Sequence, residues 1–157
     1  MTAKLSIIGV GNREMGDDGI GVILVDRLRG QRERGEWAVE GVELVSAGTD
    51  TVLAGAVMAE APASLVLDAA MMDAPAGEIR FLPAGEAETD VKWWGGTTHS
   101  VPLSGILELV RALRPEPRLT VAAIQPSVVA AGKGLSPELE SRLPEMLEKI
   151  KEEVSLP

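Results

Sequence analysis

Three acidic side chains and the only histidine of the chain are the residues best suited to chemistry. Asp17 and Asp18 follow a glycine-rich turn near the N-terminus, where a helix is expected to begin. Asp68 follows the apolar run 65–67, and His99 precedes another expected helix. Carboxylate oxygens and an imidazole nitrogen bind divalent first-row metals such as nickel, zinc and manganese. Three protein ligands from separate loops would leave positions free for water or a substrate.

Each of these residues also has a purely structural interpretation. Asp17 and Asp18 could cap the following helix and oppose its dipole, which is worth about 1 kcal/mol. Asp68 could turn the chain after its strand, although a buried carboxylate at that position needs a partner. His99 could simply begin a helix. Residue types alone therefore leave both a metal site and these structural roles open.

The glycine-rich turn itself, residues 9–21, could instead bind a phosphate through backbone N–H groups. Gly9 and Gly11 match part of a dinucleotide-binding fingerprint, but Glu14 occupies its sixth position, which requires glycine. That fingerprint also needs an acidic residue at the end of the second strand, and Glu43 lies in the middle of it. We therefore favour a metal at this turn and keep a nucleotide-binding α/β protein as the weaker alternative.

Strands and helices alternate along the chain and would position these residues. Short apolar runs predict strands over 4–10, 42–46, 64–67 and 119–124, and an alternating pattern predicts a half-exposed edge strand over 77–82. Helical spacing predicts helices over 18–34, 51–60, 100–114 and from 137 onward, with Asp50 and Ser136 as N-caps.

This order of elements predicts an α/β fold formed by a single domain over residues 1–157. The expected architecture is a three-layer αβα sandwich around a mostly parallel, five-stranded twisted sheet with one antiparallel edge strand. Ligands of such sheets bind beyond the carboxyl ends of the strands, where Asp18, Asp68 and His99 are all expected.

The segment 83–98 shows no periodicity and is expected to be a long irregular loop. Such loops are often functional. It contains Trp93 and Trp94 beside two glycines, and these tryptophans either pack inside the protein or form a docking surface for a protein partner.

The composition excludes several classes of function. A chain of 157 residues, 45% hydrophobic and 25% charged, is typical of one globular domain. Its net charge of −9 repels a phosphate backbone, so no nucleic-acid partner is expected. The chain has no cysteine, which excludes disulfides, zinc fingers and thiol nucleophiles. No serine or threonine nucleophile with a recognisable base is visible either, which disfavours a covalent acyl-enzyme.

The same sequence predicts a cytoplasmic monomer without a membrane partner. No apolar run approaches the roughly 20 residues that span a bilayer, and the N-terminus lacks the features of a signal peptide. No apolar stripe for self-association is apparent, so transient contact with a partner is expected.

Three motifs, in order along the chain, resemble those of the hydrogenase maturation endopeptidases. Residues 8–12 and 16–21, which contain Asp17 and Asp18, resemble the opening motif of that family. Residues 65–69 look like the second motif and residues 97–103 like the third. The ordered set covers nearly the whole chain and favours the metal interpretation over the structural ones.

Two further segments indicate a branch of the family. Residues 75–80 and the dipeptide Gln125-Pro126 look closest to the branch that serves hydrogenlyase-type hydrogenases and other hydrogenases of methanogens and enteric bacteria.

The resemblance implies an aspartyl-type endopeptidase that removes a C-terminal extension from the precursor of a [NiFe] hydrogenase large subunit. It implies that Asp18, Asp68 and His99 are the catalytic residues and contact nickel, which the substrate subunit supplies. Another divalent metal could occupy the site in the isolated protein. Some members carry Glu where this chain has Asp18, and we assign Asp17 to helix capping and support of the site. The alternative is a non-proteolytic metal-binding assembly factor or chaperone for the same subunit.

Overall fold

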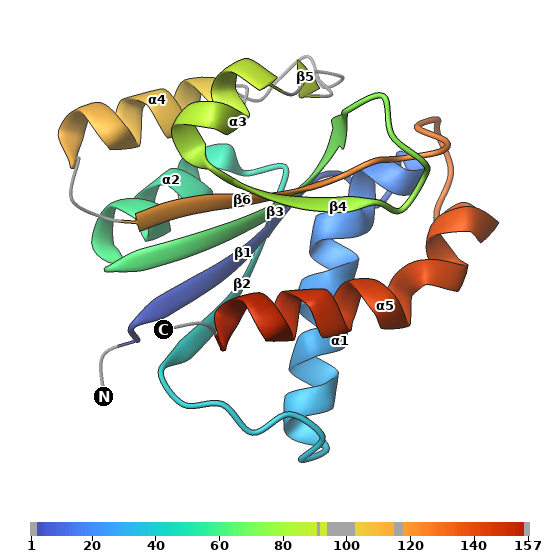
Figure 1. Ribbon diagram of the computed structural model, residues 1–157, viewed down its shortest axis with the longest axis horizontal. Coiled ribbons are helices and arrows are strands. Elements are labelled where there is room, and N and C mark those ends of the chain that lie inside the picture. Colours follow the sequence, from blue (N-terminus) through green and yellow to red (C-terminus); the bar gives the residue numbers. More distant parts are fainter. Residues whose placement is uncertain (1–2, 91, 94–102, 115–117, 156–157) are drawn as a thin grey trace.

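The central element of the structure is a twisted sheet with the strand order β2-β1-β3-β6-β4 (Figure 1). The structure is a computed structural model and describes residues 3–90, 92–93, 103–114 and 118–155. Four strands are parallel, namely β1 (Leu5–Val10), β2 (Val42–Gly48), β3 (Ala63–Met71) and β6 (Arg118–Ile124). The edge strand β4 (Ile79–Pro83) is antiparallel to β6, so the predicted sheet and its antiparallel edge strand are confirmed.

Helices cover both faces of this sheet, which confirms the three-layer α/β sandwich (Figure 1). One face packs against α1 (Ile20–Glu33) and α5 (Pro137–Val154), and the other against α2 (Thr51–Glu60), α3 (Ala84–Asp90) and α4 (Leu103–Leu113). Each face of the sheet thus has its own hydrophobic core, which we call the α1/α5 core and the α2/α4 core. Successive side chains of β3 point alternately into one core and the other. Leu65 and Leu67 belong to the α1/α5 core, and Val66 belongs to the α2/α4 core.

Two of the predicted helix starts have the expected caps. The Asp50 carboxylate accepts a hydrogen bond of 2.9 Å from the backbone N–H of Leu53 at the start of α2. The Ser136 hydroxyl accepts one of 3.3 Å from the N–H of Leu139 at the start of α5, which continues through Pro144. In the described part of the chain, no helix is both long enough and apolar enough to cross a membrane.

The first helix ends close to its predicted boundary but starts later than predicted. It begins at Ile20 rather than at Asp18, because a short 3-10 turn, η1 (Gly16–Gly19), precedes it. It also passes through Gly30 and ends at Glu33. A helix already packed on the sheet tolerates the cost of about 1 kcal/mol that an internal glycine imposes.

The third strand is longer than predicted, so Asp68 lies inside β3 and not in a loop after it. β3 continues to Met71, because Asp68 and Ala69 stay paired with β6. Beyond them, Ala70 and Met71 pair with the two-residue antiparallel strand β5 (Lys92–Trp93). The buried alanines gave no strand signal because their side chains are small and favour helices in isolation.

The prediction that residues 83–98 are irregular is wrong for the first part of that segment. α3 occupies Ala84–Asp90 and buries Ala84 and Ala87 one helical turn apart against the sheet. Two alanines in seven residues are too little apolar surface to show periodicity in the sequence. Trp93 belongs to β5, and Trp94 lies outside the described residues.

Candidate active site

Glycine contacts bring the start of α1 against the carboxyl end of β3. A Cβ atom at Gly21 would lie 2.1 Å from the carbonyl oxygen of Leu67, and one at Gly9 would lie 2.4 Å from the carbonyl oxygen of Gly21. Only glycine permits backbones to approach this closely. The chain therefore places Asp18, three residues before Gly21, next to Asp68, the residue after Leu67.

Asp18 lies in the η1 turn and is nearly buried, with 8% of its surface exposed. Its Oδ2 accepts a hydrogen bond of 2.9 Å from the backbone N–H of Asn12. Gly11 has a φ of +125°, and a Cβ there would lie 1.9 Å from the Asp18 carbonyl oxygen and 3.7 Å from Asp68 Oδ1. The glycine-rich turn thus wraps around both carboxylates.

Asp68 is likewise nearly buried, with 9% of its surface exposed, and points to the α2/α4 face of the sheet, as Val66 and Ala70 do. Its Oδ1 accepts a hydrogen bond of 2.8 Å from the N–H of Ala69. From the described residues, no hydrogen bond reaches Asp68 Oδ2 or Asp18 Oδ1. Each carboxylate therefore keeps one oxygen for another ligand.

The surroundings of the two carboxylates disfavour a negative charge on either of them. Burial raises the pKa of Asp68 well above its usual value, the negative charge of Asp18 raises it further, and the N–H of Ala69 offsets part of this effect. Burial also raises the pKa of Asp18, against the opposing hydrogen bond from Asn12. Two acids that share a poorly solvated place in this way are typical of functional sites, because a cation or a shared proton would stabilise both.

The structure brings together two of the three predicted ligands, and His99 lies outside the described residues. Within the described ranges, no three His, Cys, Asp or Glu side chains gather in an arrangement that could hold a metal. The described site is therefore a pair of carboxylates, one in the carboxyl-terminal half of β3 and one in the turn after β1, near the end of the sheet where open sheets bind ligands.

Asp17 does not cap a helix, so that prediction is wrong. Its fully buried carboxylate accepts hydrogen bonds from the N–H groups of Ser127 at 2.8 Å and Val128 at 2.8 Å, both on Oδ2. It also accepts from the N–H of Ser136 at 2.7 Å and from its hydroxyl at 2.8 Å. These donors lie more than a hundred residues further along the chain, so a search for local donors could not find them.

Backbone hydrogen bonds reinforce this link between η1 and the loop that follows β6. The N–H of Gly16 donates to the carbonyl of Gly132 at 2.9 Å, and the N–H of Asp17 donates to the carbonyl of Val128 at 2.9 Å. The N–H of Gly132 donates to the carbonyl of Glu14 at 2.8 Å. The turn that carries Asp18 is thus held from one side by Asn12 and from the other by this loop.

Gln125 holds the end of β3 in place, a role that sequence reasoning missed. Its side-chain carbonyl accepts a hydrogen bond of 2.7 Å from the N–H of Met72. The main-chain carbonyl of Gln125 accepts a hydrogen bond of 2.8 Å from the N–H of Gly77. The main-chain N–H of Gln125 donates one of 2.9 Å to the carbonyl of Glu78. The sequence marked Gln125 as part of a family-like dipeptide and as a polar residue at the end of an apolar strand, but neither signal indicates these hydrogen bonds.

The fold and the site together define a class of protein, an open α/β protein with a pair of nearly buried carboxylates toward the carboxyl ends of its strands. A family model described as hydrogenase maturation protease (HycI) matches residues 22–153, which include Asp68 and His99. The chain therefore belongs to the hydrogenase maturation protease family, whose members are endopeptidases that act on peptide bonds. The resemblance seen in the sequence motifs is confirmed.

Individual relatives agree with this assignment. A protein of Methanocaldococcus jannaschii that is assigned by name to the hydrogenase maturation proteases is 28% identical over 130 residues, which cover 80% of this chain and 74% of the relative. The hydrogenase maturating endopeptidase HybD from Escherichia coli has the same fold, with a TM-score of 0.73 at 24% identity, covering 94% of this chain and 89% of that one. The [NiFe] hydrogenase maturation protease HycI from Thermococcus kodakarensis has it too, with a TM-score of 0.67 at 20% identity, covering 96% of this chain and 91% of that one.

Proposed function

We propose that this protein is a nickel-dependent endopeptidase that removes the C-terminal extension from the precursor of a [NiFe] hydrogenase large subunit. The observation that carries this proposal is the meeting of Asp18 and Asp68, two nearly buried carboxylates, where burial raises the pKa of both and the charge of Asp18 raises the pKa of Asp68 further. A divalent cation bound between them would compensate both charges, and carboxylate oxygens suit such a cation. Family membership supplies the substrate class.

In this proposal Asp18 Oδ1 and Asp68 Oδ2 bind the nickel that the substrate carries, and His99 is the third ligand. The opposite oxygens, Asp18 Oδ2 and Asp68 Oδ1, stay on the backbone N–H groups of Asn12 and Ala69, which fix the orientation of each carboxylate. Bound nickel would supply Lewis-acid polarisation of a carbonyl group or a more acidic water. The residues of this chain position the scissile bond of the nickel-loaded precursor next to the nickel and exclude bulk water from it.

The protein in this proposal acts as a cytoplasmic monomer that contacts its client only during processing. Nickel then serves as the signal that the precursor is ready for cleavage. Without a cation between them, the carboxylates of Asp18 and Asp68 repel each other, and a precursor without nickel would not relieve that repulsion. In the isolated protein, another divalent metal could take the same position.

The test is to incubate the purified protein with large-subunit precursor from the same organism, either loaded with nickel or free of it, and to measure the mass of the precursor. We expect only the nickel-loaded precursor to lose its extension. Equal cleavage of the nickel-free precursor would overturn the nickel dependence. A stable complex with a precursor that is never shortened would overturn the protease and support the assembly-factor alternative.

A further inference from the structure

We propose that Arg80 is a substrate-binding residue of this site, whose guanidinium group binds main-chain carbonyl oxygens of the precursor segment beside the scissile bond. This inference rests on the proposed function and names a residue that recognises the peptide rather than the metal.

The first observation is the register of three neighbouring strands. Asp68 on β3 pairs with Ala123 on β6, and Ala123 pairs with Arg80 on β4. Side chains of directly paired residues point to the same face of a sheet. Asp68, Ala123 and Arg80 therefore form one row across the sheet, with the candidate site at one end and a guanidinium group at the other.

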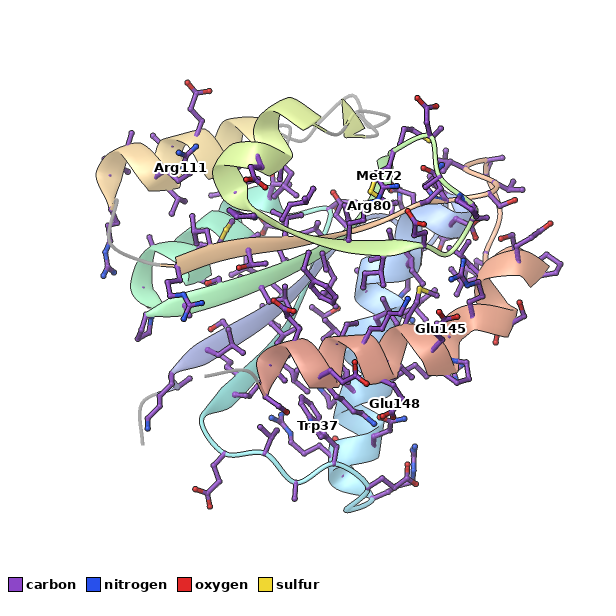
Figure 2. The ribbon with its side chains drawn as sticks, in the orientation of Figure 1. Trp37, Met72, Arg80, Arg111, Glu145 and Glu148 are labelled. Carbon is purple, nitrogen blue, oxygen red and sulfur yellow. The ribbon has the colours of Figure 1, made fainter. Side chains whose placement is uncertain are left out.

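The second observation is the face on which this row lies. Ile79 and Phe81, the neighbours of Arg80, pack into the α1/α5 core, while Leu82 packs against the α2/α4 core. Arg80 must therefore point to the α2/α4 side, as Asp68 does, and Figure 2 places it on the side of β4 that faces α3 and α4. Two strand spacings separate the backbones of Arg80 and Asp68, which is about 10 Å. Between them β6 presents only the methyl group of Ala123.

The third observation is that Arg80 forms its ion pair with Glu78 and not with Asp18 or Asp68. Its side chain is 48% exposed, and its guanidinium group forms an ion pair of 2.7 Å with Glu78, the residue just before β4. Arg80 is not among the groups that shift the pKa of Asp68, which are its own burial, Asp18 and the N–H of Ala69. An exposed ion pair of this kind is worth little, so a ligand can replace Glu78 at small cost.

The geometry selects a peptide as the ligand. A cation at Asp18 and Asp68 would repel the guanidinium group, so Arg80 must bind another part of the substrate that carries oxygen acceptors. A guanidinium group presents five N–H donors in a planar fork and suits carbonyl oxygens of an extended chain. Extended chain advances about 3.3 Å per residue, so 10 Å corresponds to about three residues from the group held at Asp68.

The experiment compares the cleavage kinetics of four variants with those of the wild type on nickel-loaded precursor. Arg80→Ala is expected to lower kcat/KM about 10- to 100-fold, mainly through a higher KM, because a charged hydrogen bond to substrate is lost. Arg80→Lys should recover part of this loss, since a lysine keeps the charge but not the fork. Arg118→Ala removes an exposed arginine from the first position of β6, at the amino-terminal end of that strand, and should leave kcat and KM unchanged.

Glu78→Gln is the control for a merely structural role. It breaks the ion pair of Arg80 while keeping the guanidinium group, so kcat/KM should stay within about two-fold of wild type. Wild-type kinetics for Arg80→Ala, or an equal loss in Glu78→Gln, would overturn this inference while the proposed function stands. A wild-type protein that leaves the precursor uncut would overturn the proposed function, and the role of Arg80 with it.

Discussion

Asp17 and Ser136 lie 119 residues apart in the sequence and are joined by two hydrogen bonds in the structure. The N–H of Ser136 donates to Asp17 Oδ1 at 2.7 Å, and its hydroxyl donates to Asp17 Oδ2 at 2.8 Å. Ser136 is also the N-cap of α5. The residue next to Asp18 therefore ties the start of the last helix to the turn that carries the candidate site.

Asp17→Asn should lower the free energy of unfolding by about 2–4 kcal/mol. The carboxylate is fully buried and accepts four hydrogen bonds, and an amide group would turn an N–H donor toward other donors. Chemical denaturation of the purified proteins measures this change. Ser136→Ala should cost about 1–2 kcal/mol, and the double variant should lose less than the sum, because the two residues share their hydrogen bonds. Strictly additive losses would show that the two side chains do not interact.

Asp68→Asn should abolish precursor cleavage and yet stabilise the metal-free protein at pH 7 by about 1 kcal/mol or more. Asn can still accept the hydrogen bond from the N–H of Ala69, while it removes a buried charge that Asp18 repels. Thermal melts of the metal-free proteins measure the difference. Asp73→Asn, a neutralised acid on an exposed turn, is the matched control and should leave the melting temperature nearly unchanged.

The stabilisation by Asp68→Asn should depend on pH with a definite sign. The pKa of Asp68 is higher in the folded protein than in the unfolded chain, so the folded state binds this proton more tightly. Its contribution to stability is fully present below the ordinary pKa of an aspartate and is lost as the pH rises through the raised pKa. The advantage of the Asn variant should therefore shrink as the pH falls toward 4, and an advantage that grows on acidification would contradict the raised pKa.

His99→Ala should reduce cleavage of the nickel-loaded precursor by about 100-fold or more and leave the fold intact. In the proposed function this imidazole is the third ligand of the substrate's nickel, and metal sites depend steeply on each ligand. Cleavage rates and circular dichroism melts of the same protein samples separate activity from folding. Normal processing by this variant would remove His99 from the site while leaving the family assignment in place.

Gly21→Ala should destabilise the protein by about 1–3 kcal/mol or more, because the new methyl group would meet backbone atoms on two strands. Its Cβ would lie 2.1 Å from the carbonyl oxygen of Leu67 and 2.6 Å from that of Val10. Gly30→Ala, in the same helix, is the control. There the nearest atom is the flexible end of Arg34 at 3.1 Å, so the substitution should stabilise the helix by up to about 1 kcal/mol. Equal effects in denaturation experiments would show that α1 does not pack on β3 this closely.

Several features could be predicted from the sequence because their causes are local. The alternation of Ile79 and Phe81 with polar residues predicts an edge strand, and β4 is that strand. Asp50 and Ser136 could be identified as N-caps because each bonds a residue three positions further on. The order of strands and helices then restricts the fold to an α/β sandwich and places Asp18 and Asp68 at one edge of the sheet.

Other features were decided only by the tertiary structure, because their partners are distant in the chain. Asp17 and Asp18 are adjacent and chemically identical, yet one bonds the loop after β6 and the other faces Asp68. No local pattern distinguishes them, since the direction of each side chain follows from how η1 packs against β3 and against the loop that leads from β6 to α5. The row from Asp68 to Arg80 likewise exists only through the pairing of three strands, which no single segment encodes.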